Sequence, residues 1–164
     1  MYEPANYGKR VVAALIDYGI VLGAGLALGI IGAFLLLAAG FGIVVWIITP
    51  LVLLGISVWN SVIRQGNTGQ SLGKSHQQIS IIRLDTNAVP GPGWMILRGL
   101  LFWFFNTITG GLFLIVDYLY PVWDKNGQRI VDKMLRTQVI GGSGNSAGSA
   151  LPPPFTHVDS DPFA

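Results

Sequence analysis

The stretch VVAALIDYGIVLGAGLALGIIGAFLLL, residues 11–37, decides the fold expected for this chain. It follows directly after Lys9 and Arg10 and contains a single charged residue, Asp17. A hydrocarbon core about 30 Å thick needs about 20 apolar helical residues, and this run is longer than that. The stretch therefore predicts a transmembrane helix. Because a carboxylate inside a membrane is costly, Asp17 is the first candidate for a special role.

The composition agrees with a membrane protein. Of 164 residues, 51% are hydrophobic and 11% are charged, whereas about 25% are charged in an ordinary soluble domain. A cleaved signal peptide would have an apolar region of about 7 to 15 residues, but here a second apolar run follows almost at once. The chain has no cysteine, which excludes disulfides and thiolate metal sites. Its net charge of +2 is too small to indicate a nucleic-acid partner.

The first half of the chain predicts a helical hairpin. Residues 1–10 form a short cytoplasmic lead-in, and helices are expected over 11–38 and 43–63. Cationic residues at both outer ends place those ends on the cytoplasmic side, because cytoplasmic loops are enriched in Lys and Arg. Residues 64–93 then form a polar cytoplasmic loop with a short strand or strand pair, turned at 85–87.

The third apolar region, residues 94–123, allows two topologies. One long helix would span about 45 Å and would place the cations that follow it outside. A hairpin of two short helices, turning at 106–111, keeps them cytoplasmic, and we favour it. The expected fold class is therefore an all-α membrane protein with two transmembrane helices, this third region and a small strand-containing cytoplasmic loop.

The C-terminal part of the chain predicts surface contacts. Residues 124–140 form an amphipathic segment whose cations could contact anionic lipid: Arg129, Lys133 and Arg136. Residues 141–164 are rich in Gly, Ser and Pro, and such a tail is expected to be disordered alone. Its extended Pro-rich motif could dock in a groove of a partner, or the tail could be an idle linker; the motif is Pro152, Pro153, Pro154 and Phe155.

Two pairs of glycines in the first helix could permit close helix packing. Gly19 and Gly23 form one pair, and Gly25 and Gly29 form the other. Small residues four apart let helix backbones approach each other in a membrane. Glycine is also simply common in membrane helices, so packing and composition both explain these positions.

With these segments placed, the chain resembles the RDD family of small bacterial membrane proteins over most of residues 6–140. The resemblance rests on four features. The first three are an arginine and an aspartate in the first helix, Arg10 and Asp17; the loop Gly69 to Lys74 before a strand; and Arg98, which opens the third region. The fourth is a closing run from 117 to 137, which contains Asp117, Asp132 and Thr137. Ser71 stands where the family more often has threonine. The resemblance implies a multi-pass protein of the bacterial inner membrane with a cytoplasmic N-terminus, and no particular reaction.

The charged residues suggest an ion pair. Arg10 and Asp17 are seven residues apart, so they share a helix face at about 10.5 Å separation along the axis. We predict that Asp17 pairs with Arg98, with Arg10 nearby, and that Asp132 belongs to the same structural set. Asp117 has no assigned cation and is the more plausible transport carboxylate, because a nearby arginine lowers the pKa of a carboxyl group and makes it a poor proton carrier.

No pattern of catalytic residues stands out. The two histidines are isolated, and the glycine spacing before Lys74 does not fit a phosphate-binding loop. No enzyme activity, metal or cofactor is therefore expected. The favoured hypothesis is an accessory or scaffold subunit that packs against other membrane protein subunits. The alternative is an ion or small-solute transporter that acts as an oligomer.

Overall fold

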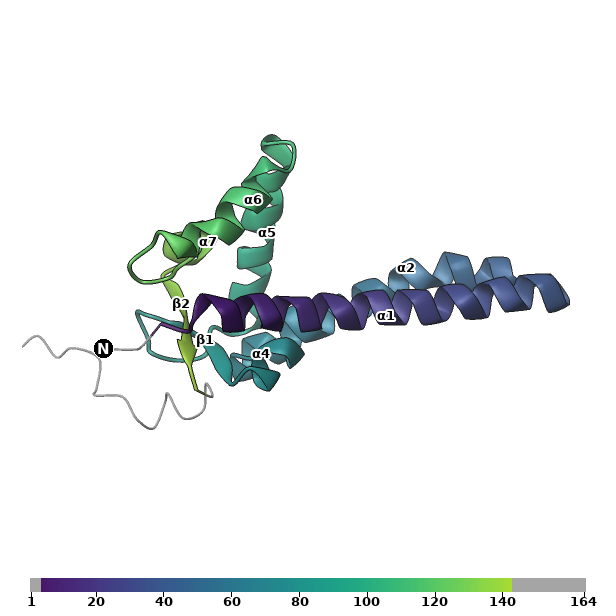
Figure 1. Ribbon diagram of the computed structural model, residues 1–164, viewed down its shortest axis with the longest axis horizontal. Coiled ribbons are helices and arrows are strands. Elements are labelled where there is room, and N and C mark those ends of the chain that lie inside the picture. The colour runs from purple at the N-terminus through teal and green to yellow at the C-terminus, as the bar shows by residue number, and fades with distance from the viewer. Residues whose placement is uncertain (1–3, 143–164) are drawn as a thin grey trace, which may run out of the picture.

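Two helical hairpins extend in different directions from a small base (Figure 1). The computed structural model describes residues 4–142 and is mostly helical. The first hairpin consists of α1 (Tyr7–Ala39) and α2 (Gly42–Val58), and the second consists of α5 (Pro92–Ile108) and α6 (Leu112–Leu119). The base holds the remaining elements, so it is where segments distant in the sequence meet.

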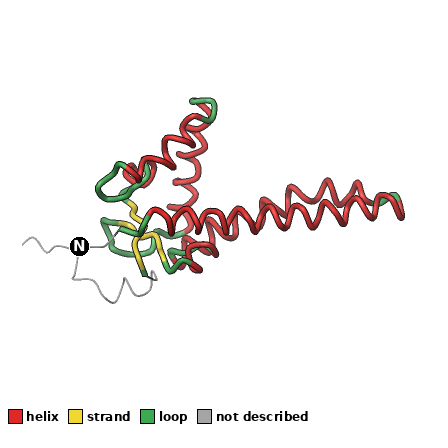
Figure 2. Tube along the Cα trace, in the orientation of Figure 1, coloured by secondary structure: helices red, strands yellow, loops and turns green. Residues whose placement is uncertain are grey.

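The base contains only short elements. A π-helical turn, η1, continues α2, and short helices and two strands follow (Figure 2). In chain order the elements are η1 (Trp59–Arg64), α3 (Gln65–Thr68), α4 (Leu72–His76), β1 (Ile79–Arg83), the 3-10 turn η2 (Tyr120–Val122), α7 (Ile130–Met134) and β2 (Thr137–Gly141).

The two strands form an antiparallel pair, with Ile81 opposite Val139. The turn expected at 85–87 follows β1 but does not lead to its partner, which lies beyond the second hairpin. Three isoleucines of β1 are completely buried. An apolar strand is needed to cover them, and β2 supplies Val139 and Ile140, both nearly buried. The main apolar core of the described chain therefore lies in the base.

The third apolar region forms a hairpin and not one long helix. Helix α5 ends at Ile108 and α6 begins at Leu112. Gly110 and Gly111 have φ angles of 61° and 94°, a left-handed conformation that glycine adopts without strain. This reversal brings the end of α6 back to the base, where the chain enters η2.

The first hairpin is closed by glycines near its turn. A Cβ atom at Gly42 would lie 2.0 Å from the carbonyl oxygen of Gly32, and one at Gly32 would lie 2.6 Å from the Trp46 indole nitrogen. These two glycines therefore permit the close approach of α1 and α2.

The glycines predicted to pack lie elsewhere on α1. Gly25 is near α2, since its Cβ would lie 3.4 Å from Leu53. At the other three a Cβ would meet nothing within 4 Å: Gly19, Gly23 and Gly29. Within residues 4–142 those three take no part in close helix packing, because the α1–α2 contact is closest near the turn.

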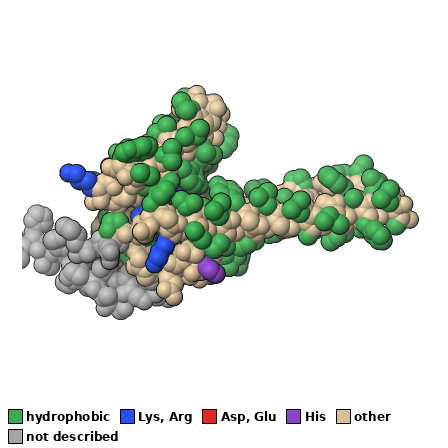
Figure 3. All heavy atoms as spheres, in the orientation of Figure 1, with side chains coloured by type: hydrophobic (Ala, Val, Ile, Leu, Met, Phe, Trp, Pro, Cys, Tyr) green, Lys and Arg blue, Asp and Glu red, His purple; other side chains and the backbone are tan. Residues whose placement is uncertain are grey.

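Both hairpins carry apolar side chains on their surfaces. The helices Tyr7–Ala38 and Gly42–Thr68 are long and apolar enough to cross a membrane, and only 6% of each apolar window is buried. Figure 3 shows hydrophobic side chains over both hairpins on the face drawn, with the visible Lys, Arg and His side chains away from the hairpin tips. Such a distribution is opposite to that of a soluble helical protein, which buries its apolar faces.

Candidate functional site

Asp17 connects α1 to the loop that precedes β1. Its Oδ1 accepts hydrogen bonds from Asn60 Nδ2 and from the backbone N–H of Gly73, both at 2.8 Å. Its Oδ2 accepts from Ser71 Oγ at 2.5 Å. The Asn60 carbonyl oxygen in turn accepts from the backbone of Leu72 at 2.8 Å. Asp17 therefore joins α1, η1 and α4 through uncharged donors.

The loop from Gly69 to Lys74 is shaped for this contact. Gly69 ends α3 with a φ of 74°, and Ser71 begins α4 as its N-cap, accepting from the backbone of Lys74. A Cβ at Gly73 would lie 1.9 Å from the carbonyl oxygen of Ala13. Three positions of the loop thus have a physical reason: a left-handed turn at Gly69, a hydroxyl that caps and donates at Ser71, and an absent side chain at Gly73. A threonine in place of Ser71 would retain the hydroxyl.

Arg98 pairs with Asp132, which corrects the predicted pair of Asp17 with Arg98. Both Nε and Nη2 of Arg98 lie 2.7 Å from Asp132 Oδ1. The Asp132 side chain is fully buried and also accepts from Thr137 Oγ1 at 3.3 Å. Burial alone would raise the pKa of Asp132, but the charges of Arg98 and Arg129 outweigh it and hold that pKa below its usual value. The pair joins α5 to α7.

The predicted pairing of Asp17 with Arg98 rests only on how deep the two residues lie along their helices. Asp17 and Arg98 both line the same cavity, but Asp17 points to α4, a helix that was not predicted within the polar loop 64–93. Two hydrogen bonds from the loop and one from Asn60 of η1 satisfy Asp17, so it needs no cation. Arg98 is then satisfied by Asp132, which β2 and α7 hold nearby.

Asp117 is also paired, although the sequence had left it without a cation. Arg129 Nε lies 2.7 Å from Asp117 Oδ2, Nη2 donates to the same oxygen, and the backbone of Val131 donates to Oδ1 at 3.1 Å. The Arg129 guanidinium also lies 4.0 Å from the Tyr118 ring centroid. Burial lowers the pKa of Arg129, but Tyr118, Asp132 and Asp117 together raise it above its ordinary value.

Only part of the predicted lipid-contacting set is free for that role. Arg129 points inward to Asp117 and is 18% exposed. Lys133 is 41% exposed and pairs with Asp124 at 2.6 Å, and Arg136 is exposed. The amphipathic segment thus uses Arg129 internally, because the start of α7 is held against α6 through Asp117.

Arg10 holds the base to the start of α1. Its Nε donates to the carbonyl oxygen of Ala5 at 3.0 Å and its Nη2 to that of Val139 at 2.8 Å, while Nη1 donates to Gly127. Within residues 4–142 no carboxylate forms an ion pair with it. Three backbone carbonyl oxygens therefore take the place of a directly paired carboxylate.

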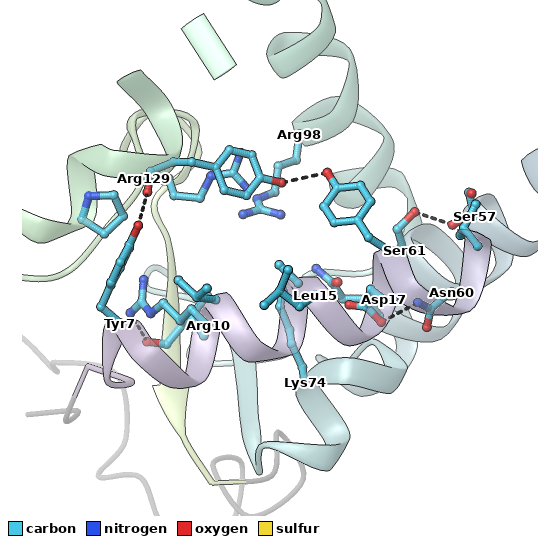
Figure 4. Close-up of a pocket in the computed structure, with 18 residues that line it drawn as sticks. Tyr7, Arg10, Leu15, Asp17, Ser57, Asn60, Ser61, Lys74, Arg98 and Arg129 are labelled. Carbon is cyan, nitrogen blue, oxygen red and sulfur yellow. Dashed lines mark hydrogen bonds between the residues drawn. The ribbon is translucent and has the colours of Figure 1, made fainter. Parts of the chain in front are cut away.

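A cavity of about 600 Å³ lies where the two hairpins meet. Figure 4 shows Arg10, Arg98 and Asp17 around this space, with Lys74 extending toward it from α4. Tyr18 and Tyr118 connect the two hairpins beside it through their hydroxyls, 3.3 Å apart. The cavity brings together Arg10, Asp17 and Arg98, which were predicted to be neighbours.

The most important residues that sequence reasoning missed are Asn60, Ser71 and Lys74. Asn60 carries an amide in an otherwise apolar run, which is a usable signal because such groups are costly in a membrane without a partner. Ser71 and Lys74 had been placed in a turn-rich loop, and nothing in their spacing indicates that the loop folds back onto α1.

The pH dependence of stability should report on Lys74. Burial, helped by the charge of Arg98, lowers the pKa of Lys74 from 10.5 to about 7. Between these values the unfolded chain binds one more proton than the folded chain, so stability should rise with pH, by at most about 1.4 kcal/mol per pH unit. Unfolding midpoints of the wild type and Lys74→Gln in detergent, measured from pH 7 to 10, check this. Equal slopes in the two proteins would contradict it.

Replacing Asp17 should distinguish the contribution of its hydrogen-bond acceptors to stability from that of its charge. Asp17→Asn keeps one acceptor for Gly73 and Asn60, so we expect a loss of about 1–2 kcal/mol in unfolding free energy. Asp17→Ala leaves three donors without their acceptor and should cost about 3 kcal/mol or more. Thermal unfolding in detergent measures both. If Asn were as harmful as Ala, the contacts would depend on the charge itself.

The fold and the site together define a small helical protein of membrane type, with two apolar hairpins that meet at a base containing buried ion pairs. The model of the RDD family matches residues 4–136, and the chain belongs to this family. It is 31% identical over 80 residues to the proline-rich antigen of Mycobacterium leprae, covering 49% of this chain and 30% of that protein. It is 30% identical over 83 residues to the proline-rich antigen homolog of Mycobacterium tuberculosis, covering 51% of this chain and 32% of that protein.

The matched region spans about a third of the length of these relatives. No solved structure matches the chain. The family membership and the two long apolar helices together support a membrane protein.

Proposed function

We propose that this chain is a non-enzymatic, multi-pass protein of the bacterial inner membrane that acts as an accessory subunit of a larger membrane assembly. The observation that carries the proposal is the exposure of the first hairpin, whose apolar windows are only 6% buried. Apolar helices of this length are stable in lipid or against other membrane helices. The second hairpin begins and ends at the base, and its two helices are too short to cross a membrane twice.

The charge distribution supports a cytoplasmic base and N-terminus. Lys9, Arg10 and Arg64 lie at the base end of the first hairpin, whereas its turn at 39–41 carries no charge. Lys125 and Arg136 belong to the segment that follows the second hairpin. Cations flanking membrane helices favour the cytoplasmic side, so all of them agree on one orientation.

Open glycines on α1 support packing with another subunit. A Cβ at Gly19, Gly23 or Gly29 would meet no atom within 4 Å, so these positions are not used for close packing within residues 4–142, and Gly19 and Gly23 share one face of α1. Interfaces between membrane helices are enriched in small residues. The Pro-rich motif at 152–155 lies outside the described residues, and its docking on a partner stays a prediction.

Purification in mild detergent tests the accessory role. We expect a stoichiometric membrane partner, which Gly23→Leu should displace because leucine fills the open face. Gly55→Leu on α2 is the matched control, since nothing lies within 4 Å of its Cβ position either. A homogeneous oligomer of this chain alone would contradict the proposal.

Transport is the second candidate, favoured by the cavity beside α1. The pairing of Asp117 with Arg129 argues against a proton-carrying role for that carboxylate. Flux in liposomes that depends on pH or sodium would support transport, and its loss in Asp117→Asn would show that this carboxylate takes part despite its ion pair.

A further inference from the structure

The cavity between the hairpins has an excess of positive charge. Four cationic side chains line it, from four different parts of the chain: Arg10, Lys74, Arg98 and Arg129. Asp17 is its only acidic lining residue within the described chain. Figure 4 shows Arg10 and Arg98 on different sides of this space.

Two of these cations have no carboxylate partner within residues 4–142. Asp132 pairs with Arg98 and Asp117 pairs with Arg129, whereas Asp17 accepts only from uncharged donors. Arg10 instead donates to three backbone carbonyl oxygens, but the Nζ of Lys74 makes no hydrogen bond or ion pair within residues 4–142. With these three carboxylates and four cations the site has a net positive charge, and an ammonium without a partner is costly in a half-buried position, so a ligand with one negative charge would relieve it.

The rest of the cavity wall suits an apolar group. The apolar lining comes mainly from one face of α1 and includes Val11, Ala14, Leu15 and Val21. The hydroxyl groups of Tyr18, Ser61 and Tyr118 add a few polar contacts. A volume of about 600 Å³ is that of a site for a small organic ligand. A bare inorganic ion would fill little of it.

We propose that this cavity binds the phosphodiester headgroup of an amphiphile, with Lys74 donating to the phosphate beside Arg10 and Arg98. A phosphodiester carries the single negative charge that the site lacks. Each arginine retains N–H groups beyond those used internally, and guanidinium N–H groups match phosphate oxygens. This mode differs from a phosphate-binding loop, because side chains and not backbone N–H groups hold the anion.

The placement of the cavity favours an anionic lipid as the source. Its lining runs along α1 from Tyr7 to Val21, that is, from the cationic end into the apolar part of the helix. A lipid would place its phosphate near Lys74 and its chains between the hairpins. This choice of source rests on the proposed membrane placement, whereas a water-soluble phosphate would use the same donors without it.

Lipid binding to the full chain in nanodiscs tests the proposal. Phosphatidylglycerol, titrated into a phosphatidylcholine background, should bind saturably, and Lys74→Gln should weaken it about 10- to 100-fold. The matched control is Lys9→Gln, an exposed lysine outside the cavity, which should bind as the wild type does. Saturable binding of inorganic phosphate to detergent-solubilised protein, lost in Lys74→Gln, would support the same site with a soluble source.

The pH dependence of binding gives a second readout. A bound phosphate stabilises the ammonium form of Lys74, which faces Arg98, Arg129, Asp17 and Asp132, so binding should take up a proton above pH 7. Wild-type affinity should fall from pH 7 to 9, and Lys74→Gln should lose this dependence.

Three results would overturn the inference. They are equal affinity for phosphatidylglycerol in Lys74→Gln, absence of saturable binding by both lipid and phosphate, and the same pH dependence in both proteins. None of them bears on capture of a partner subunit, so failure here is distinct from failure of the accessory role.

Discussion

Asp132→Ala is expected to lower the free energy of unfolding by about 3–5 kcal/mol. The substitution leaves the Arg98 guanidinium, itself only 15% exposed, without its carboxylate. It also removes the acceptor for Thr137 and the capping contact at the start of α7. Because the pKa of Asp132 is lowered, the stability from this pair is present above about pH 4 and is lost as pH falls through the lowered value. Chemical or thermal unfolding in detergent at pH 7 measures the loss.

Two further variants make this prediction specific. Lys133→Met breaks an ion pair from its 41% exposed side and leaves Asp124 able to accept from Gln128, so it should cost much less than Asp132→Ala. Arg98→Met combined with Asp132→Leu removes both buried charges and should be less harmful than the sum of the single changes. Additive losses in that double mutant would show that the two side chains are not coupled.

Gly73→Ala is expected to cost about 3 kcal/mol or more. The new Cβ would lie 1.9 Å from the carbonyl oxygen of Ala13 and 2.8 Å from its carbon, and both are backbone atoms of α1 that cannot turn aside. Helix α4 would have to move away, which also breaks the hydrogen bond from Gly73 to Asp17. The unfolding midpoint in detergent measures the effect.

Gly19→Ala is the matched control for Gly73→Ala. It lies on α1, where a Cβ meets nothing within 4 Å, and alanine is the better helix former. Its unfolding midpoint should equal or slightly exceed that of the wild type. If Gly73→Ala were tolerated as well, α4 would not be in close contact with α1.

The long helices could be predicted because their signal is local. An apolar run such as 11–37 specifies a helix whatever surrounds it, and the glycines at 110–111 with a polar flank indicate the reversal in the third region. The partner of β1 could not be predicted, since β2 follows three further α-helices (α5, α6 and α7) and contributes only five residues.

The pairing of the charged side chains depends on rotation about helix axes, which spacing along one helix does not give. Arg98 and Asp132 are 34 residues apart, and Asp17 and Ser71 are 54 apart. Depth in the membrane suggested that Asp17 and Arg98 could meet. The fold of α4 decides otherwise, because its N-cap and backbone satisfy Asp17 first.

The sequence also does not show which glycines are in close contact with other elements. Their spacing on α1 indicates that close packing is possible, but the positions where a side chain would collide with backbone depend on the tertiary fold. Those positions are Gly42 and Gly73, together with Gly66, whose Cβ would lie 2.5 Å from the nitrogen of Pro92.

Single-cysteine labelling in intact cells tests the central claim most directly, that the first hairpin spans the membrane with the base inside. The chain has no native cysteine, so Phe41→Cys at the turn and Lys125→Cys at the base each report one position. We predict that a membrane-impermeant maleimide labels Phe41→Cys from outside and labels Lys125→Cys only after the membrane is opened. Labelling of both positions from outside, or of Lys125→Cys alone, would contradict the account.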